Sequence, residues 1–368
     1  MKKPILILML ALMTTAWSQQ QTPKLVEGPF SDRELAQFIA LGPIDTHTHV
    51  FQDDPTFYVM LRRLNLHIVN ILFDDDSGEQ KQSLSEERRA AWNVVHKSGG
   101  YAVLCTTFNP FEFNQPNFAR HAMDEIEQDF SKGAVAVKIW KNVGMEIKDR
   151  DGNYVMPDNP EFAPIFRDIA TRNKTLIAHL ADPDTIWQPP SPLAPDYNYY
   201  MKHQKLYMYG KPGAPSKAEI LYARDKVVRE NPNLRVVGAH LGSMEADFAR
   251  LSRVLDQNPN FAIDLAARMD YVEKQPRAEI IAFITKYQDR LVYGTDNESF
   301  PGDAVQDVPR RWESVYANDW RFFATTDTIR YKGRQASGLA LPEAILRKIY
   351  HDNAVKWFPG VLGEKGAQ

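Results

Sequence analysis

The chain has 368 residues, of which 43% are hydrophobic and 25% are charged, and its formal net charge at pH 7 is −3. This length suits one large domain or two small ones, and the composition is typical of a globular protein with an apolar core. A near-neutral charge without a basic excess argues against a nucleic-acid partner.

The first residues have the pattern of an export signal. Lys2 and Lys3 precede an apolar stretch over 4–15 that is too short to span a bilayer comfortably, and small residues follow at Ala16 and Ser18. We predict a signal peptide over 1–18 and an exported protein, periplasmic or secreted, with no stable membrane insertion after cleavage. A retained membrane anchor is the alternative. The sequence further predicts a linker over 19–30, a folded domain over 31–360 and a tail over 361–368.

Eight short apolar runs, rich in β-branched residues, predict buried parallel strands. They lie at 44–50, 67–73, 101–109, 134–140, 175–180, 235–241, 261–266 and 291–295. Segments of helical period lie at 32–41, 83–97, 118–131, 160–173, 217–230, 244–257, 277–287 and 341–358. This alternation predicts a single-domain α/β fold, a (β/α)8 TIM barrel. A doubly wound open sheet is the alternative, but no glycine-rich phosphate loop follows the first run.

The single cysteine and two long connections allow further expectations. Cys105 lies inside the third run, so we expect a core residue rather than a nucleophile, and one cysteine excludes a disulfide within the chain. The connections over 182–216 and 297–339 are rich in aromatic residues. In a barrel we expect both above the C-terminal ends of the strands, as lids or specificity walls. The second connection contains Trp312, Trp320, Phe322 and Phe323.

Histidine and aspartate residues gather where the predicted strands end. His47 and His49 lie two apart in the first run, so their side chains point to one face and can grip a divalent cation. His179, His240 and Asp296 end the fifth, sixth and eighth runs. Because a barrel gathers its strand ends into one rim, we expect these side chains to converge. A metal would supply the partner that buried imidazoles and carboxylates need.

This set of motifs resembles the amidohydrolase superfamily. His47-Thr-His49, the histidines after the fifth and sixth runs and Asp296 carry the resemblance. The stretch over 341–354 is similar to the amidohydrolase-related (amidohydrolase 2) branch, which includes decarboxylases, lactonases and hydratases. The resemblance covers roughly residues 43–360 and is specific to the superfamily rather than to one reaction.

For the mononuclear branch, the resemblance implies one metal with four ligands: His47, His49, His179 and Asp296. His240 would then act beside the metal. Lys138, in the otherwise apolar fourth run, departs from many members of that branch. In other members a lysine here is carboxylated by CO2 and bridges two metals, which would put Lys138, His179 and His240 on the second ion. An unmodified Lys138 that binds an anionic substrate group is the other interpretation, and both stay open.

Further residues are expected to line the pocket and bind substrate: Arg268, Trp140, Lys141 and His203. Arg268 follows the seventh run and could hold a substrate carboxylate with two parallel hydrogen bonds, or pair with a neighbouring aspartate. His203 could reach the site from above, out of the connection over 182–216. Asp45 could orient a ligand imidazole from behind.

The first hypothesis for the reaction is hydrolysis of an ester, lactone or amide bond of a small molecule by metal-activated water. Asp296 would move the proton, and the metal or His240 would stabilise charge on the carbonyl oxygen. Nitrogen and oxygen ligands without thiolate suit Zn, with Mn as the alternative, in one or two ions. A metal-dependent non-oxidative decarboxylase of an unsaturated or aromatic acid is one alternative, and an exported non-catalytic binding protein is another. A homodimer is expected on base rates alone.

Overall fold

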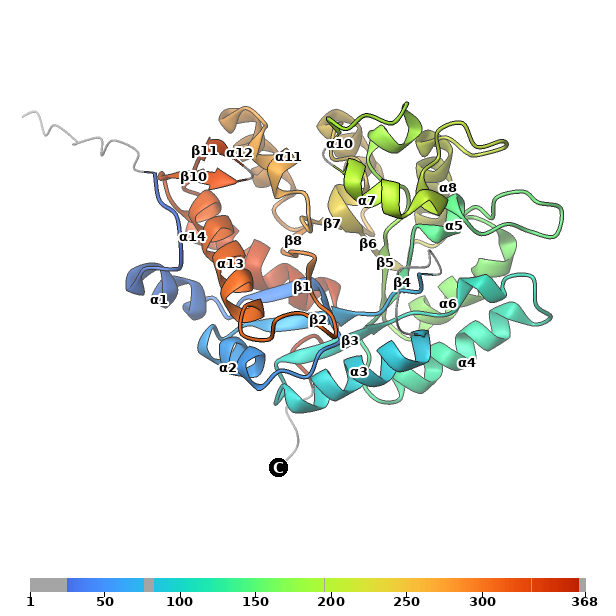
Figure 1. Cartoon of the computed structure of the whole chain (residues 1–368), viewed down its shortest axis with the longest axis horizontal. Helices are drawn as coiled ribbons and strands as arrows, with labels where there is room; N and C mark the ends of the chain where they lie inside the picture. The colour runs from blue at the N-terminus through green and yellow to red at the C-terminus, as the bar shows by residue number, and fades with distance from the viewer. Residues whose placement is uncertain (1–24, 76–82, 195, 332, 364–368) are drawn as a thin grey trace, which may run out of the picture.

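The centre of the molecule is a sheet of parallel strands, seen in a computed structural model that describes residues 25–75, 83–194, 196–331 and 333–363. Each strand pairs with the next one along the chain, in the order β8-β7-β6-β5-β4-β3-β2-β1-β9 (Figure 1). The strands are β1 (Ile44–Val50), β2 (His67–Ile71), β3 (Ala102–Thr106), β4 (Ala136–Ile139), β5 (Thr175–Ala178), β6 (Arg235–Gly238), β7 (Phe261–Asp264), β8 (Leu291–Val292) and β9 (Asn297–Ser299). The predicted α/β barrel is confirmed.

The sheet closes on itself because the eighth strand of the barrel is split. β8 pairs with β7, while β9, a few residues further on, pairs with β1. Between the two pieces, the N–H of Thr46 donates to the carbonyl of Tyr293 at 2.9 Å, and the N–H of Asp296 donates to the carbonyl of His47 at 2.8 Å. The sequence predicts one strand over 291–295. Instead the chain turns at Asp296, whose φ is +65°, and this turn sets the carboxylate beside the end of β1.

Helices cover the outside of the sheet, and Figure 1 shows α3, α4 and α6 running along one flank. At the start of α3, the Ser83 hydroxyl accepts from the N–H of Glu86, and the Glu86 carboxylate accepts from the N–H of Ser83 at 2.9 Å, which is a capping box. The longer helices are α1 (Asp32–Ala40), α2 (Pro55–Arg63), α3 (Leu84–Lys97), α4 (Phe118–Phe130), α6 (Ala163–Thr171), α8 (Lys217–Glu230), α10 (Phe248–Gln257), α12 (Arg277–Tyr287) and α13 (Val308–Ala324).

Short helical turns fill the loops between these elements. The α-helical ones are α5 (Asn142–Met145), α7 (Tyr197–Lys202), α9 (Ala239–Gly242), α11 (Met269–Glu273), α14 (Glu343–Arg347) and α15 (Asn353–Trp357). Tighter 3-10 turns lie at Pro110–Glu112, Pro160–Phe162, Asp184–Trp187 and Gln204–Leu206. The predicted helix over 341–358 is broken by a π-helical turn, Lys348–Asp352, whose Ile349 carbonyl accepts from the N–H of Tyr293.

The strands are buried on both faces, as a sheet wrapped by helices requires. All seven residues of β1 are buried, although the strand carries Asp45, His47 and His49. Cys105 on β3 is also fully buried, in agreement with the core position expected from the sequence. Burial raises the pKa of its thiol, which keeps it protonated and unreactive at neutral pH.

The connection over 297–339 differs from the expectation of a loop above the strand ends. It contains α13 and the antiparallel hairpin of β10 (Thr328–Tyr331) and β11 (Arg334–Ser337). Trp312, Trp320, Phe322 and Phe323 all lie on α13 and are buried in the wall of the barrel. Trp312 packs edge-on against Phe57 of α2 at 4.8 Å between ring centroids. These aromatic residues therefore build the core and are not a specificity wall.

The predicted signal peptide over 1–18 lies outside the described residues, as do residues 19–24 of the predicted linker and 364–368 of the predicted tail. Within the described ranges, no helix has the length and apolar character needed to cross a membrane.

One carboxyl group in the barrel wall links folding to pH. Asp319 on α13 is buried, and burial raises its pKa to about 7, against the opposite effect of a hydrogen bond from the Tyr293 hydroxyl. In an unfolded chain the same group ionises at about pH 3.9. The folded state therefore holds a proton that the unfolded state releases, and its stability falls as pH rises toward and through 7.

Asp319→Asn removes this ionisation. We expect the melting temperature of the variant to fall less than that of the parent protein between about pH 5 and about pH 8, with the largest relative gain at the higher pH. Thermal melting at both pH values measures the effect, and Asp151→Asn, at an exposed turn, is the matched control. An unchanged pH dependence in Asp319→Asn would contradict the assignment.

Candidate functional site

A cavity of about 310 Å³ opens at the C-terminal ends of the strands. In a barrel of this kind the loops after the strands build the site, so its lining comes from many parts of the chain. The lining residues include His47, His49, Phe73, Lys138, Trp140, Lys141, His179, Asp182, Asp196, Tyr199, Tyr200, His240, Arg268, Asp296 and Glu298. The five metal-ligand candidates at strand ends and Lys138 are all present in this set.

The first group of side chains joins the end of β1 to the turn between β8 and β9. Nε2 of His47 and Nε2 of His49 each lie 3.3 Å from Oδ1 of Asp296. Ligands bound about 2.1 Å from a tetrahedral cation lie about 3.4 Å from one another. The spacing of this group therefore suits one divalent cation.

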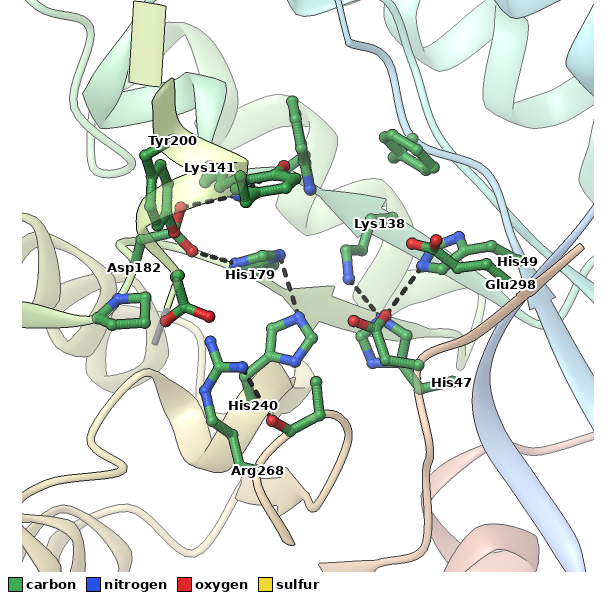
Figure 2. Close-up of a pocket in the computed structure, with 17 residues that line it drawn as sticks. His47, His49, Lys138, Lys141, His179, Asp182, Tyr200, His240, Arg268 and Glu298 are labelled. Atoms are coloured by element: carbon green, nitrogen blue, oxygen red, sulfur yellow. Dashed lines mark hydrogen bonds and ion pairs between the residues drawn. The ribbon is translucent and has the colours of Figure 1, made fainter. Parts of the chain in front are cut away.

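The second group joins the ends of β5 and β6. Nδ1 of His179 faces Nε2 of His240 at 3.2 Å. Figure 2 shows this pair on the opposite side of Lys138 from His47 and His49. The four ligands implied for a single metal are thus divided, because His179 lies with His240 and not with the first group.

In each of the four rings, one nitrogen points away from the other ligand candidates and lies beside a hydrogen-bond acceptor. We call it the outer nitrogen, and the other one the inner nitrogen. His49 Nδ1 lies 2.9 Å from the carbonyl of Ile71, and His240 Nδ1 lies 2.9 Å from the carbonyl of Ala266. A carbonyl only accepts, so these nitrogens must carry the proton. His47 Nδ1 and His179 Nε2 face carboxylates in the same way, Asp264 at 2.7 Å and Asp182 at 3.0 Å.

The inner nitrogens of the buried rings are consequently unprotonated. Burial lowers the pKa of His47 and His240 well below the usual value, and lowers that of His179 to about 3 against the opposing effect of Asp182. A neutral imidazole has one N–H, and in each of these rings that N–H is on the outer nitrogen, where it donates to the neighbouring acceptor. Their lone pairs point at one another, at the Asp296 carboxylate or at Nζ of Lys138, an arrangement that suits a bound cation.

Asp296 itself is ionised. Burial acts to raise the pKa of its carboxyl, but the neighbouring side chains of His240, His49 and His47 together hold it well below the usual range. Its side chain keeps 25% of its surface exposed toward the cavity mouth. Asp296 can therefore both bind a cation and meet a substrate.

Lys138 stands between the two groups (Figure 2). Its side chain rises from β4, is almost fully buried, and brings Nζ to 3.1 Å from Nε2 of His47. Burial lowers the pKa of the ammonium to about 8, although Asp264 and Asp296 act in the opposite direction. A larger share of this amine is neutral at pH 7 than of an exposed lysine.

A strained turn presents His240. From His240 to Ser243 every φ lies between 56° and 60°, in the left-handed region that L residues avoid. The N–H of His240 donates to Oδ1 of Asp264 at 2.7 Å, which holds the start of the turn. Gly238 is required just before it, because a Cβ there would lie 2.5 Å from Cζ of Phe261.

The expected substrate-binding residues lie in different surroundings. Trp140 and Arg268 line the cavity, and so does Lys141, whose ammonium forms an ion pair with Asp182 at 2.7 Å. His203 does not line the cavity. It is buried behind Tyr199, with the two rings stacked at 4.2 Å between centroids.

Arg268 has unused hydrogen-bonding capacity. Nη1 donates to the carbonyl of Ala267 at 3.1 Å, and Nε has no hydrogen-bond partner among the described residues. The aspartates considered as its partners are engaged elsewhere, since Asp270 pairs with Lys274 and Asp264 with His47. The guanidinium therefore keeps an unused donor, although burial, which acts to lower its pKa, is outweighed by the charges of Glu245 and Asp182, which raise it.

Two functional side chains were missed by sequence reasoning. Asp264 ends β7 and accepts from both His47 and the His240 backbone, and Asp182 orients His179. The only available signal was an aspartate at the end of an apolar run and another three residues after a histidine. Asp45, expected behind an imidazole, instead accepts from the hydroxyls of Thr295 at 2.6 Å and Tyr316 at 2.9 Å and so ties the start of β1 to the turn after β8 and to α13.

A family model described as Amidohydrolase matches residues 105–360. The chain belongs to the amidohydrolase family. None of the curated proteins matches this amidohydrolase. Solved structures resemble it at low identity, and at these identities the likeness concerns the fold.

A 2,6-dihydroxybenzoate decarboxylase complexed with 2,6-dihydroxybenzoate shares 14% identity, with 86% of this chain and 99% of that chain covered and a TM-score of 0.50. A dihydroxybenzoic acid decarboxylase from Polaromonas sp. JS666 with bound manganese shares 15% identity, with 87% and 97% covered and a TM-score of 0.48. A 4-oxalomesaconate hydratase from Rhodopseudomonas palustris shares 9% identity, with 86% and 95% covered and a TM-score of 0.47.

The residues present fit a divalent metal. His47, His49 and Asp296 offer ligand atoms that all lie within 4.8 Å of one another. Asp264 falls into a similar group with His47 and His240, but its oxygens already accept hydrogen bonds from both residues. Asp264 therefore orients these histidines rather than offering a further ligand.

Asp264→Ala tests this orienting role. Without the carboxylate, His47 loses its tautomer and the turn of His240 loses its anchor, so we expect metal affinity to fall about 10- to 100-fold. Unfolding free energy should fall by about 1–3 kcal/mol, because buried donors lose their acceptor. Calorimetric metal titration and urea denaturation measure these effects, with Asp270→Ala at a partly exposed ion pair as the control. An unchanged metal affinity would contradict the role.

Proposed function

We propose that this amidohydrolase is a metal-dependent hydrolase that cleaves an ester, lactone or amide bond of a small anionic molecule. The observation that carries the proposal is the pair of ligand groups with unprotonated inner nitrogens on either side of Lys138. His47, His49 and Asp296 would hold one divalent ion. His179 and His240 would hold a second, and Zn or Mn suits both nitrogen-rich groups.

The chemistry of the bound metal would be to lower the pKa of water toward neutrality and to polarise a substrate carbonyl. The protein side chains then handle the proton and the substrate. Asp296, ionised and partly exposed, is placed to accept a proton from water and pass it to the leaving group. If only the first group binds an ion, Nε2 of His240 remains available beside the reacting carbon.

Lys138 is proposed to join the two groups after reaction with CO2. The neutral amine attacks CO2, a C–N bond forms and one proton is released, which leaves a carbamate with two oxygens. The burial of Lys138 between the groups, and its lowered pKa of about 8, both favour this reaction at neutral pH. Each carbamate oxygen would then serve one ion.

The anionic part of the substrate is assigned to Arg268. Its guanidinium faces the cavity with unused donors, and planar, fixed donors suit a carboxylate. Phe73 and Trp140, whose rings lie 5.3 Å apart, form an apolar wall of the same cavity. A small molecule with a carboxylate and a flat or apolar body fits this combination.

Decarboxylation of an unsaturated or aromatic acid is the second candidate. The same arginine and the same aromatic wall would bind such an acid, and the fold is shared with a 2,6-dihydroxybenzoate decarboxylase. A second ion favours hydrolysis over this alternative, because two-metal sites stabilise both the attacking and the leaving oxygen.

The deciding experiment is metal analysis followed by isotope labelling. The purified protein, reconstituted with Zn or with Mn in the presence of bicarbonate, is expected to bind two ions per chain and to gain the mass of one CO2 at Lys138. Screened against lactones, esters and aromatic acids in oxygen-18 water, it should incorporate the label into its product. His47→Ala combined with His49→Ala should abolish turnover.

Release of CO2 without incorporation of label would overturn hydrolysis in favour of decarboxylation. Full activity in the double histidine variant would overturn the metal assignment altogether. Arg268→Met, which keeps the ion count while raising KM for anionic substrates, separates substrate binding from metal binding.

A further inference from the structure

We propose that Lys141 and Asp182 form a positioning pair that orients His179 and thereby controls binding of the second metal ion, without affecting the first. This inference rests on the proposed two-ion function. Neither residue needs to touch the substrate for this role, since the pair acts through the imidazole of His179.

The contact between Asp182 and His179 defines the role. Oδ1 of Asp182 lies 3.0 Å from Nε2 of His179, on the side of the ring that faces away from His240. An ionised carboxylate can only accept, so it keeps the ring proton on Nε2 and leaves Nδ1 as a lone pair toward His240. A carboxylate behind a ligand imidazole is a known device for fixing both tautomer and ring orientation.

Lys141 holds Asp182 in its ionised form. Nζ lies 2.7 Å from Oδ2 of Asp182, and both side chains are almost completely buried, at 5% and 2% exposure. At this distance the ammonium and the carboxylate form a charge-assisted hydrogen bond, which favours the ionised form of the carboxylate. Without the ammonium, this buried carboxylate would have no cation to balance it.

The position of Lys141 is itself fixed by aromatic rings. Its Nζ lies 5.1 Å from the ring centroid of Trp140, 4.9 Å from that of Tyr199 and 5.6 Å from that of Tyr200. It also donates to the Tyr199 hydroxyl at 3.3 Å. The ammonium is thus engaged by Asp182 and by these rings, while substrate binding by Lys141, which lines the cavity, stays a prediction from the sequence.

The selectivity for the second ion follows from a comparison of the four histidines. His49 and His240 are oriented by backbone carbonyls, and His47 is oriented by Asp264, which also anchors the His240 turn. Only His179 is oriented by a side chain that has no contact with the first group (Figure 2). A change at Asp182 or Lys141 should therefore reach the second ion alone.

The pair also connects the second ion to the cover of the cavity. Tyr199 and Tyr200 lie on α7, in the long segment between β5 and α8, and both line the cavity beside Lys141. Any movement of α7 that displaces these rings would loosen Lys141, then Asp182, and then the ring of His179.

The experiment measures ions per chain and the affinity of each ion in full-length protein, by elemental analysis after dialysis and by calorimetric titration with Zn. Asp182→Asn lets the amide donate to His179 and so admits the wrong tautomer, and Lys141→Met leaves the carboxylate unbalanced. In each variant we expect the second ion to bind at least about 10-fold more weakly. The first ion should bind as in the parent protein.

Two controls separate positioning from damage to the fold. Tyr199→Phe keeps the ring and the ion pair and removes only the hydroxyl, so it should keep both ions. The double variant Lys141→Met with Asp182→Asn leaves no unbalanced buried charge, so it should fold like the parent protein and still lose the second ion.

Outcomes for the two proposals differ. Two ions of unchanged affinity in Asp182→Asn and in the double variant, beside two in the parent, would overturn the positioning role and leave the proposed function intact. Equal weakening of both ions would also overturn it, because the effect would then be general. A single ion in the parent protein would overturn the two-ion function and this inference with it.

Discussion

Each imidazole at the mouth of the barrel donates a hydrogen bond from its outer nitrogen to a neighbouring acceptor. The chemistry of the site depends on this constraint. Two of the acceptors are backbone carbonyls and two are carboxylates, so four rings are held in one tautomer by partners that cannot donate in return. The inner nitrogens of the buried rings are left as converging lone pairs. Apart from His47 Nε2, which lies 3.1 Å from the Lys138 amine, these lone pairs face one another, and binding of a cation would stabilise them.

The backbone around the cavity is arranged to sustain this geometry. The chain adopts left-handed φ values at Ala181, His240, Ala267 and Asp296, each just after a strand end. Such conformations persist only where the surrounding structure holds them, and here Asp264 and the neighbouring strands do so. The strain lies at the rim, while the strands below it are regular and buried.

The three cationic side chains of the cavity differ in their partners. Lys141 is neutralised by Asp182, and Lys138 lies between the histidine groups, so neither is free for an anion in the arrangement described. Arg268 keeps unused donors at the cavity wall. The three basic residues therefore have different surroundings, which the sequence alone does not reveal.

Local pattern alone determined much of this protein. Apolar runs of strand length alternating with helical period specify a barrel, and a barrel brings the ends of its strands together, so convergence of His47, His49, His179, His240 and Asp296 could be predicted without coordinates. The helical spacing of Trp312, Tyr316, Trp320 and Phe323 was also legible, although it was interpreted as a loop.

Only the tertiary structure decided how those side chains are divided and oriented. Whether His179 joins the first group or pairs with His240 depends on which ring nitrogen faces Asp182, a matter of side-chain torsion that no spacing encodes. The same holds for Lys141 and Arg268. Neighbours from distant strands and loops decide that Lys141 forms an ion pair and that Arg268 keeps an unused donor. Sequence determines which residues reach the rim, and packing in three dimensions determines which partner each one finds there.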